Sequence, residues 1–396
     1  MVLIPFFIFF IFCIYRYKVG IHLLYVNTCS VIIFGIIIDG DYSLNSYLIS
    51  YLISNTLVLI GYSIVKELKV GVGVYAASAV KINYLAIQIS FLIISFVIFL
   101  HYAIVGIPFL SESFDSVRFL QANSGYLGIP SRFASYMPSI MMLTLVFYLF
   151  HGGIRVWQRR IMTALVLVVF ILQGHKSSLL QVVLLGVVAY PYCDIKSQLK
   201  GSFKWFFVLS LMAGYFLFTQ LVTTQDLQFF KYVISRLSTM MHSSGEYLIE
   251  LDANDFTFFM NNPVINDLLY PINKLFNSEY EALNTQLSRK IYGVDDGDFS
   301  VPVTPGFFAY HYFSLGLYPE KIYSFLIGVI VGLLDQRSRL TMRPMIKVSY
   351  VFISYWLYIG YTSGNLYYLI PNVIFCLTFF ILFYSAIVSF LKSIKE

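Results

Sequence analysis

Hydrophobic residues occur in long unbroken runs along most of this chain, and polar residues gather in the segments between them. Runs of about 20 apolar residues have the length of an α-helix that crosses the hydrocarbon core of a membrane. The pattern predicts eleven such spans, over residues 2–15, 21–38, 46–65, 83–104, 136–150, 157–173, 177–192, 205–222, 319–334, 347–363 and 366–391. We expect the first run to be a span with its N-terminus outside, because no basic segment precedes it and no cleavage site follows it.

The composition agrees with this pattern. The chain has 396 residues, of which 59% are hydrophobic and 12% are charged, against about 25% charged in an average soluble domain. It predicts an all-α, polytopic integral membrane protein with one membrane domain over residues 1–396 and no soluble catalytic domain. The four cysteines lie within spans or at their ends, at no metal-ligand spacing, and are expected to be packing residues: Cys13, Cys29, Cys193 and Cys376.

Charge predicts which side each loop occupies. Most of the 26 basic residues fall in the short loops on one side, which the positive-inside rule makes cytoplasmic. The two longest loops, over residues 105–135 and 223–318, then lie on the outer side. The stretch "GHKSS" must be a turn between two spans, since fusing those spans would divide the basic residues almost evenly between the sides. Lys176 therefore lies at the outer end of a helix pair. The alternative to a functional role is a lysine whose ammonium group reaches the membrane interface beside a helix cap.

Several residues of the outer loops have chemistry suited to a lipid-linked pyrophosphate. Guanidinium groups bind phosphate in a bidentate manner and stay charged, and an ammonium group adds a point charge. The candidates are Arg118, Arg132, Lys176 and Arg236. For each of them, a salt bridge or a headgroup contact is the alternative role.

A sugar hydroxyl that attacks an anomeric carbon needs a general base within hydrogen-bond reach. The outer candidates are His311, which lies in an aromatic segment leading into a span, and Glu246, with His242 and His175 after them. A hydrogen-bonded interface histidine is the alternative for His311. The histidines near other span ends, His22 and His101, are expected to be packing or interface residues.

Other kinds of chemistry have little support in the sequence. The carboxylates of "GVDDGDFS" do not match a calcium-loop spacing and are expected to form a solvated turn, so we expect no metal site. Nucleotide-binding and hydrolase motifs are absent from the chain, and every predicted cytoplasmic loop is short, which argues against a nucleotide-linked donor and predicts no cofactor. The basic residues form no stripe, so we expect no nucleic-acid partner.

Three segments resemble the Wzy-type O-antigen and capsule repeat-unit polymerases: "GHKSSLL", "RLSTMMHSSGEYL" and "PVTPGFFAYHYFSLGLYPEKIYSFLIGVIVGLL". The resemblance implies a GT-C-like membrane fold with a long periplasmic loop, in the bacterial inner membrane. It implies metal-independent glycosyl transfer from an undecaprenyl-pyrophosphate-linked glycan to a lipid-linked repeat unit at the periplasmic face. Its implied partners are this lipid-linked oligosaccharide, membrane lipids, a chain-length regulator and a flippase.

The resemblance also implies roles for the candidate residues. Arg118, Arg132, Lys176 and Arg236 would hold the pyrophosphate, and His311 or Glu246 would deprotonate the acceptor hydroxyl. An O-antigen ligase or another lipid-linked glycosyltransferase would show nearly the same features. A transporter of lipid-linked oligosaccharide would carry charges along a mid-span path, which the spans lack, and a membrane scaffold would depend on none of these residues.

Overall fold

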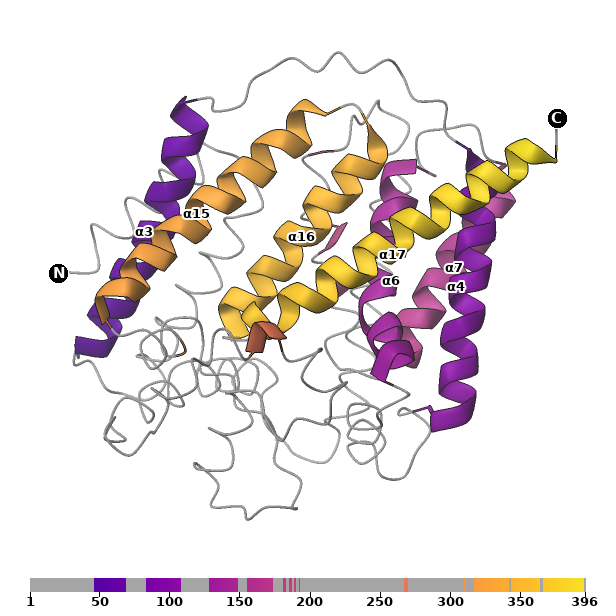
Figure 1. The fold of residues 1–396 in the computed structure, drawn as a ribbon, viewed down its shortest axis with the longest axis horizontal. Helices are drawn as coiled ribbons and strands as arrows, with labels where there is room; N and C mark the ends of the chain where they lie inside the picture. Colours follow the sequence, from indigo (N-terminus) through magenta and orange to yellow (C-terminus); the bar gives the residue numbers. More distant parts are fainter. Residues whose placement is uncertain are drawn as a thin grey trace, which may run out of the picture. The chain divides into compact units, whose positions relative to one another are not determined.

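The computed structural model describes residues 46–68, 83–107, 128–148, 155–173, 267–269, 310, 317–341, 343–363 and 366–394, with a few residues between 181 and 192. Every element within these residues is helical (Figure 1). The main helices are α3 (Ser46–Leu68), α4 (Tyr84–Val105), α6 (Gly128–Tyr148), α7 (Val156–Leu172), α15 (Leu317–Leu340), α16 (Pro344–Ser363) and α17 (Leu366–Ser393). The all-helical prediction is confirmed for this part of the chain.

Most helix bounds match the predicted spans closely. Two helix ends differ clearly: α6 begins at Gly128 although the predicted span began at residue 136, and α15 continues to Leu340 although the predicted span ended at residue 334. Residues 128–135, expected to end the first outer loop, are therefore helical. Their glycine, serine and proline content suggested a loop, but Pro130 lies in the first turn, where a backbone N–H would have no helical partner to lose. The predicted spans 2–15, 21–38, 205–222 and most of 177–192 lie outside the described residues.

Two of the described helices, α4 and the Leu369–Ser393 part of α17, are long and apolar enough to cross a membrane. Helix α4 exposes large apolar side chains, and its largely apolar buried face also contains polar ones. Its buried residues include Ser90, Ser95 and His101, whereas Phe96 and Ile104 are each 65% exposed. Large apolar side chains on the exposed surface and small or polar ones inside are typical of a helix that faces lipid.

Helix α15 also exposes large apolar side chains and buries polar ones. Its buried side chains include Glu320, Ser324, Asp335 and Ser338, and its exposed large side chains are Ile322, Leu326, Ile330 and Leu340. The cost of burying carboxylates is reduced only when they are paired and hydrogen-bonded, and both of these are. This helix therefore combines an apolar outer face with a polar inner face.

Internal contacts divide the chain into two compact units. The first comprises Met1–Gly73, Asp226–Arg337 and Ser354–Pro371, and the second comprises Val74–Gln225, Ser338–Ile353 and Asn372–Glu396. The prediction of one membrane domain over residues 1–396 stays a prediction.

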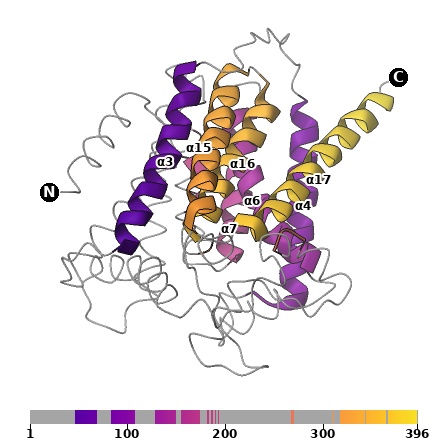
Figure 2. The same ribbon diagram turned by 60° about the vertical axis from the view of Figure 1, so that its left-hand side comes forward.

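In the first unit, α3 and α15 lie side by side (Figures 1 and 2), and glycines bring their backbones into contact. A methyl group added at Gly328 would collide with the carbonyl oxygen of Val58, and one added at Gly61 would collide with that of Phe325. Gly332, one turn beyond Gly328, faces Val65. This small-residue spacing is a common means of close helix pairing in membranes.

Polar contacts at the other end of this pair fix the direction of the two helices. The Tyr62 hydroxyl donates to the Asp335 carboxylate over 2.8 Å, and Lys66 forms an ion pair with the same carboxylate. Because Asp335 and Lys66 lie near the C-terminal ends of their helices, α3 and α15 run parallel. The predicted topology requires this of the spans over 46–65 and 319–334, which both cross from outside to inside.

The second unit is built on α4, α6 and α7, each of which contacts the other two. The Asn83 side chain accepts a hydrogen bond from the Ala86 N–H and begins α4, and Gly106, at a φ of 97°, ends it. At the end where α6 begins, the Gln173 amide after α7 donates to the Ala134 carbonyl oxygen over 2.6 Å. Helices α6 and α7 are therefore antiparallel.

Candidate functional site

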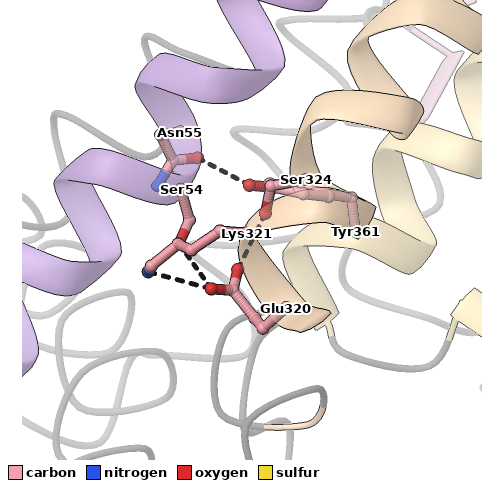
Figure 3. A network of polar contacts seen from close by, with 6 residues as sticks. All are labelled: Ser54, Asn55, Glu320, Lys321, Ser324 and Tyr361. Carbon is pink, nitrogen blue, oxygen red and sulfur yellow. Dashed lines mark hydrogen bonds and ion pairs between the residues drawn. The ribbon is translucent and has the colours of Figure 1, made fainter. Parts of the chain in front are cut away.

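The most polar cluster among the described residues lies where α15 begins against α3 and α16 (Figure 3). Six side chains form it, and we call them the α15 cluster: Ser54, Asn55, Glu320, Lys321, Ser324 and Tyr361. All belong to the first compact unit. Glu320 lies in the first turn of α15, where the positive end of the helix dipole stabilises a carboxylate.

Glu320 is the centre of the cluster and is completely buried. Its Oε2 atom accepts a hydrogen bond from the Ser54 hydroxyl at 2.9 Å and lies 2.8 Å from the Lys321 ammonium nitrogen. Its Oε1 atom accepts from the Ser324 hydroxyl at 2.7 Å. The Lys321 ammonium also donates to the Ser54 oxygen at 2.6 Å, so Ser54, Glu320 and Lys321 form a closed triangle.

The adjacent residue of α3 connects this helix to α16. Tyr361 donates its hydroxyl proton to Asn55 Oδ1 over 3.0 Å, and both side chains are buried. The hydrogen bond that Ser54 donates to Glu320 therefore joins α3 to α15, and the one that Asn55 accepts from Tyr361 joins α3 to α16. Three helices that lie far apart in the sequence are held together at this level.

The hydrogen bonds limit what the α15 cluster can do chemically. Both oxygens of Glu320 already accept hydrogen bonds, and the residue has no exposed surface, so it is not placed to take a proton from a substrate hydroxyl. The glutamate and lysine charges offset one another. The cluster is therefore suited to holding the start of α15 in place rather than to acid–base chemistry.

A second buried contact lies close in sequence to the predicted base His311. Tyr310 donates its hydroxyl proton to Asp267 Oδ2 over 2.7 Å, and both residues are almost completely buried. This contact fixes the residue that directly precedes His311. His311 itself lies outside the described residues.

The structure describes one of the six residues predicted for the site. Arg132 lies in the first turns of α6, half-buried, and its carbonyl oxygen is 3.9 Å from the Cys376 sulfur of α17. Arg118, Lys176, Arg236, Glu246 and His311 lie outside the described residues, so their grouping stays a prediction. Within the described ranges, no group of histidine, cysteine or carboxylate side chains could hold a metal ion.

Sequence reasoning did not single out the residues of the α15 cluster as a site. A signal for them exists, because "ISNTL" and "YPEKIYSF" place polar side chains inside apolar runs. Polar residues within a span are costly and usually face a partner. The sequence does not show which of these residues pair with one another.

Comparison with known proteins identifies no relative: no family model, no curated protein and no solved structure matches this chain.

Proposed function

We propose that this chain polymerises undecaprenyl-pyrophosphate-linked oligosaccharide repeat units into O-antigen or capsular polysaccharide. The reaction takes place at the outer face of the bacterial cytoplasmic membrane, where the multi-pass chain is embedded. The bond between the anomeric carbon of the growing glycan and the pyrophosphate oxygen breaks. A hydroxyl of the incoming repeat unit forms the new glycosidic bond, its proton passes to a base, and lipid pyrophosphate leaves.

The observation that carries this proposal is the position of charge along the described helices. Every Lys, Arg, Asp and Glu of α3, α4, α6, α7, α15, α16 and α17 lies within about two turns of a helix end. A transporter of charged lipid would need polar groups along a path through the centre of the membrane. Charge collected at helix ends instead supports chemistry at the membrane surface.

The exposed apolar side chains of α4 and α15 support a membrane location. Helix α4 exposes Leu92, Phe96 and Ile104 while it buries Ser90 and Ser95, a pattern that water would penalise and lipid would favour. The two helices that meet the length and hydropathy requirements of a span add to this support.

The proposed site consists of the residues that the sequence singles out. Arg118, Arg132, Lys176 and Arg236 hold the pyrophosphate and stabilise the negative charge that develops as it leaves, the effect that is usually the largest in catalysis. His311, or Glu246 in its place, accepts the proton of the attacking hydroxyl. The α15 cluster holds the helix that follows His311.

An O-antigen ligase is the second candidate, because it would use the same donor and differ only in its acceptor. The segments that resemble the polymerase family favour polymerisation. The two activities differ in their products, since loss of a polymerase leaves single repeat units on the lipid A core, whereas loss of a ligase leaves the core without any repeat unit.

The test is complementation of a strain of the source bacterium from which this gene is deleted, with the lipopolysaccharide ladder or capsule polymer as the readout. The wild-type gene should restore polymer, whereas Arg236→Ala and His311→Ala should leave single repeats, with protein levels and membrane insertion unchanged. Arg160→Ala is the matched control, since Arg160 is exposed at the predicted cytoplasmic start of α7 and should support full polymer. A wild-type gene that does not restore polymer would disprove the polymerase proposal, and full polymer from both site variants would disprove the residue assignments.

A further inference from the structure

A buried histidine of the second unit has no hydrogen-bond partner within the described residues. His101 of α4 is 3% exposed, and neither Nδ1 nor Nε2 meets a donor or an acceptor. Its ring lies 5.4 Å from that of Tyr102, at a tilt of 59°, which does not satisfy either nitrogen. Buried polar groups in native proteins nearly always have a partner, because a missing one costs the desolvation of the group. Packing alone therefore does not explain this imidazole.

An arginine of the same unit is partly buried, and its guanidinium has no ion-pair partner among the described residues. Arg132 is half-buried near the start of α6, and in the described part of the chain its guanidinium takes part in no ion pair or hydrogen bond. The carbonyl oxygen of this residue lies 3.9 Å from the Cys376 sulfur of α17. A permanent cation that is partly withdrawn from water, with no carboxylate beside it among the described residues, is suited to an anionic ligand.

Both residues lie at the same end of the second unit. His101 is one helical turn before the end of α4 at Val105, and Arg132 is one turn after the start of α6 at Gly128. Each therefore lies roughly 5 Å inside its helix end. Helices α4 and α6 contact one another, and Figures 1 and 2 show the end of α4 near the start of α6.

We propose that His101 and Arg132 together bind a phosphate group of a lipid-linked ligand at this end of the second unit. A phosphate oxygen would accept hydrogen bonds from the imidazole and the guanidinium, and so satisfy both. The start of α6 adds unpaired backbone N–H groups and the positive end of the helix dipole. His101 thus joins Arg132 as a ligand-binding residue.

Two sources could supply this phosphate. One is the pyrophosphate of the polyprenyl-linked substrate, an assignment that rests on the proposed function. The other is the headgroup of an anionic membrane phospholipid. The chemistry at the protein is the same for both, and the experiment separates them.

The test measures ligand binding to the full-length protein, freed of lipid, in a neutral detergent. Undecaprenyl pyrophosphate, phosphatidylglycerol and inorganic pyrophosphate are titrated in turn, and dissociation constants are measured by microscale thermophoresis. The variants are His101→Phe, which removes both ring nitrogens at similar volume, His101→Gln, which keeps an N–H donor, Arg132→Gln, and His101→Phe with Arg132→Gln. Size-exclusion chromatography and circular dichroism show that each variant is folded.

We expect His101→Phe to weaken binding of the lipid-linked phosphate by about tenfold to a hundredfold, since it removes a hydrogen bond to a charged group. His101→Gln should keep most of the affinity, and it replaces His101→Phe if that variant does not fold. The effects of His101→Phe and Arg132→Gln should not add, because both residues contact one group. Ser95→Ala is the matched control: Ser95 is buried and unpartnered on the same helix, further from its end, and its loss should leave binding unchanged.

The outcomes separate the sources and the proposals. If the variants bind only undecaprenyl pyrophosphate more weakly, the site binds the substrate. If they bind phosphatidylglycerol more weakly, the site binds a phospholipid headgroup. Unchanged affinity for both lipids in His101→Phe and His101→Gln, strictly additive effects, or equally tight binding of inorganic pyrophosphate would overturn the lipid-phosphate site. Binding is measured without polymer formation, so this result and the complementation result can fail independently.

Discussion

At the scale of single residues, two buried carboxylates of the described helices, Glu320 and Asp335, are each paired with a lysine. Glu320 pairs with Lys321 at the start of α15. Asp335, near the end of α15, pairs with Lys66 of α3. Removing one partner of a buried pair leaves the other charge uncompensated, whereas replacing both by apolar groups often costs little. The two kinds of change therefore have different expected outcomes.

Glu320→Gln should lower the free energy of unfolding by about 2–4 kcal/mol, because the Lys321 ammonium then remains partly buried without its carboxylate. The double variant Glu320→Gln with Lys321→Met should recover a large part of this loss. The measurement is unfolding by sodium dodecyl sulfate in mixed micelles. Equal stability of the wild type and Glu320→Gln would show that the α15 cluster does not hold α15 in place.

At the scale of helices, the close approach of α3 and α15 depends on glycine. No side chain fits between Gly328 and the Val58 backbone, or between Gly61 and the Phe325 backbone. Close backbone contact replaces the hydrophobic effect as the source of helix association within lipid. The two glycines of "GVIVGLL", Gly328 and Gly332, are therefore explained by this close contact, which a hydropathy pattern does not show.

Gly328→Val should destabilise this helix pair by about 1–3 kcal/mol, because the added carbons overlap the backbone of α3 and force the helices apart. Leu326→Ala is the control, since Leu326 is an exposed side chain of the same helix and its truncation should change stability by less than about 0.5 kcal/mol. Unfolding in mixed micelles measures both variants. A Gly328→Val protein as stable as Leu326→Ala would contradict the close packing.

At the scale of the whole molecule, the expected topology assigns each helix end to one side of the membrane. Pro319, at the start of α15, and Arg160, at the start of α7, are both exposed and belong to opposite predicted sides. Two exposed positions on different predicted sides allow a direct comparison.

In a variant without native cysteines, Pro319→Cys should react with a membrane-impermeant maleimide in cells whose outer membrane is permeable. Arg160→Cys should react only after the cytoplasmic membrane is opened, because charged reagents do not cross the hydrocarbon core. Labelled protein is detected on a gel. Labelling of Arg160→Cys in intact cells would overturn the predicted orientation.

The sequence by itself determined the helical class and most helix bounds, because apolar runs of the length of the bilayer leave few alternatives to helices whose backbone groups are satisfied internally. It failed at the start of α6, where glycine, serine and proline are typical of a loop but are also accepted in a first helical turn. It proposed Arg132 from charge and position, and gave His101 only a packing or interface role.

Only the tertiary structure decided which polar residues meet. Ser54 and Glu320 are separated by 266 positions and Asn55 and Tyr361 by 306, so no local pattern links them. The same holds for the contact of Gly328 with Val58, and for the isolation of the His101 ring. Hydropathy indicates whether a segment favours lipid or water. The hydrogen-bond partner of each polar side chain depends instead on how helices that are distant in the sequence pack together.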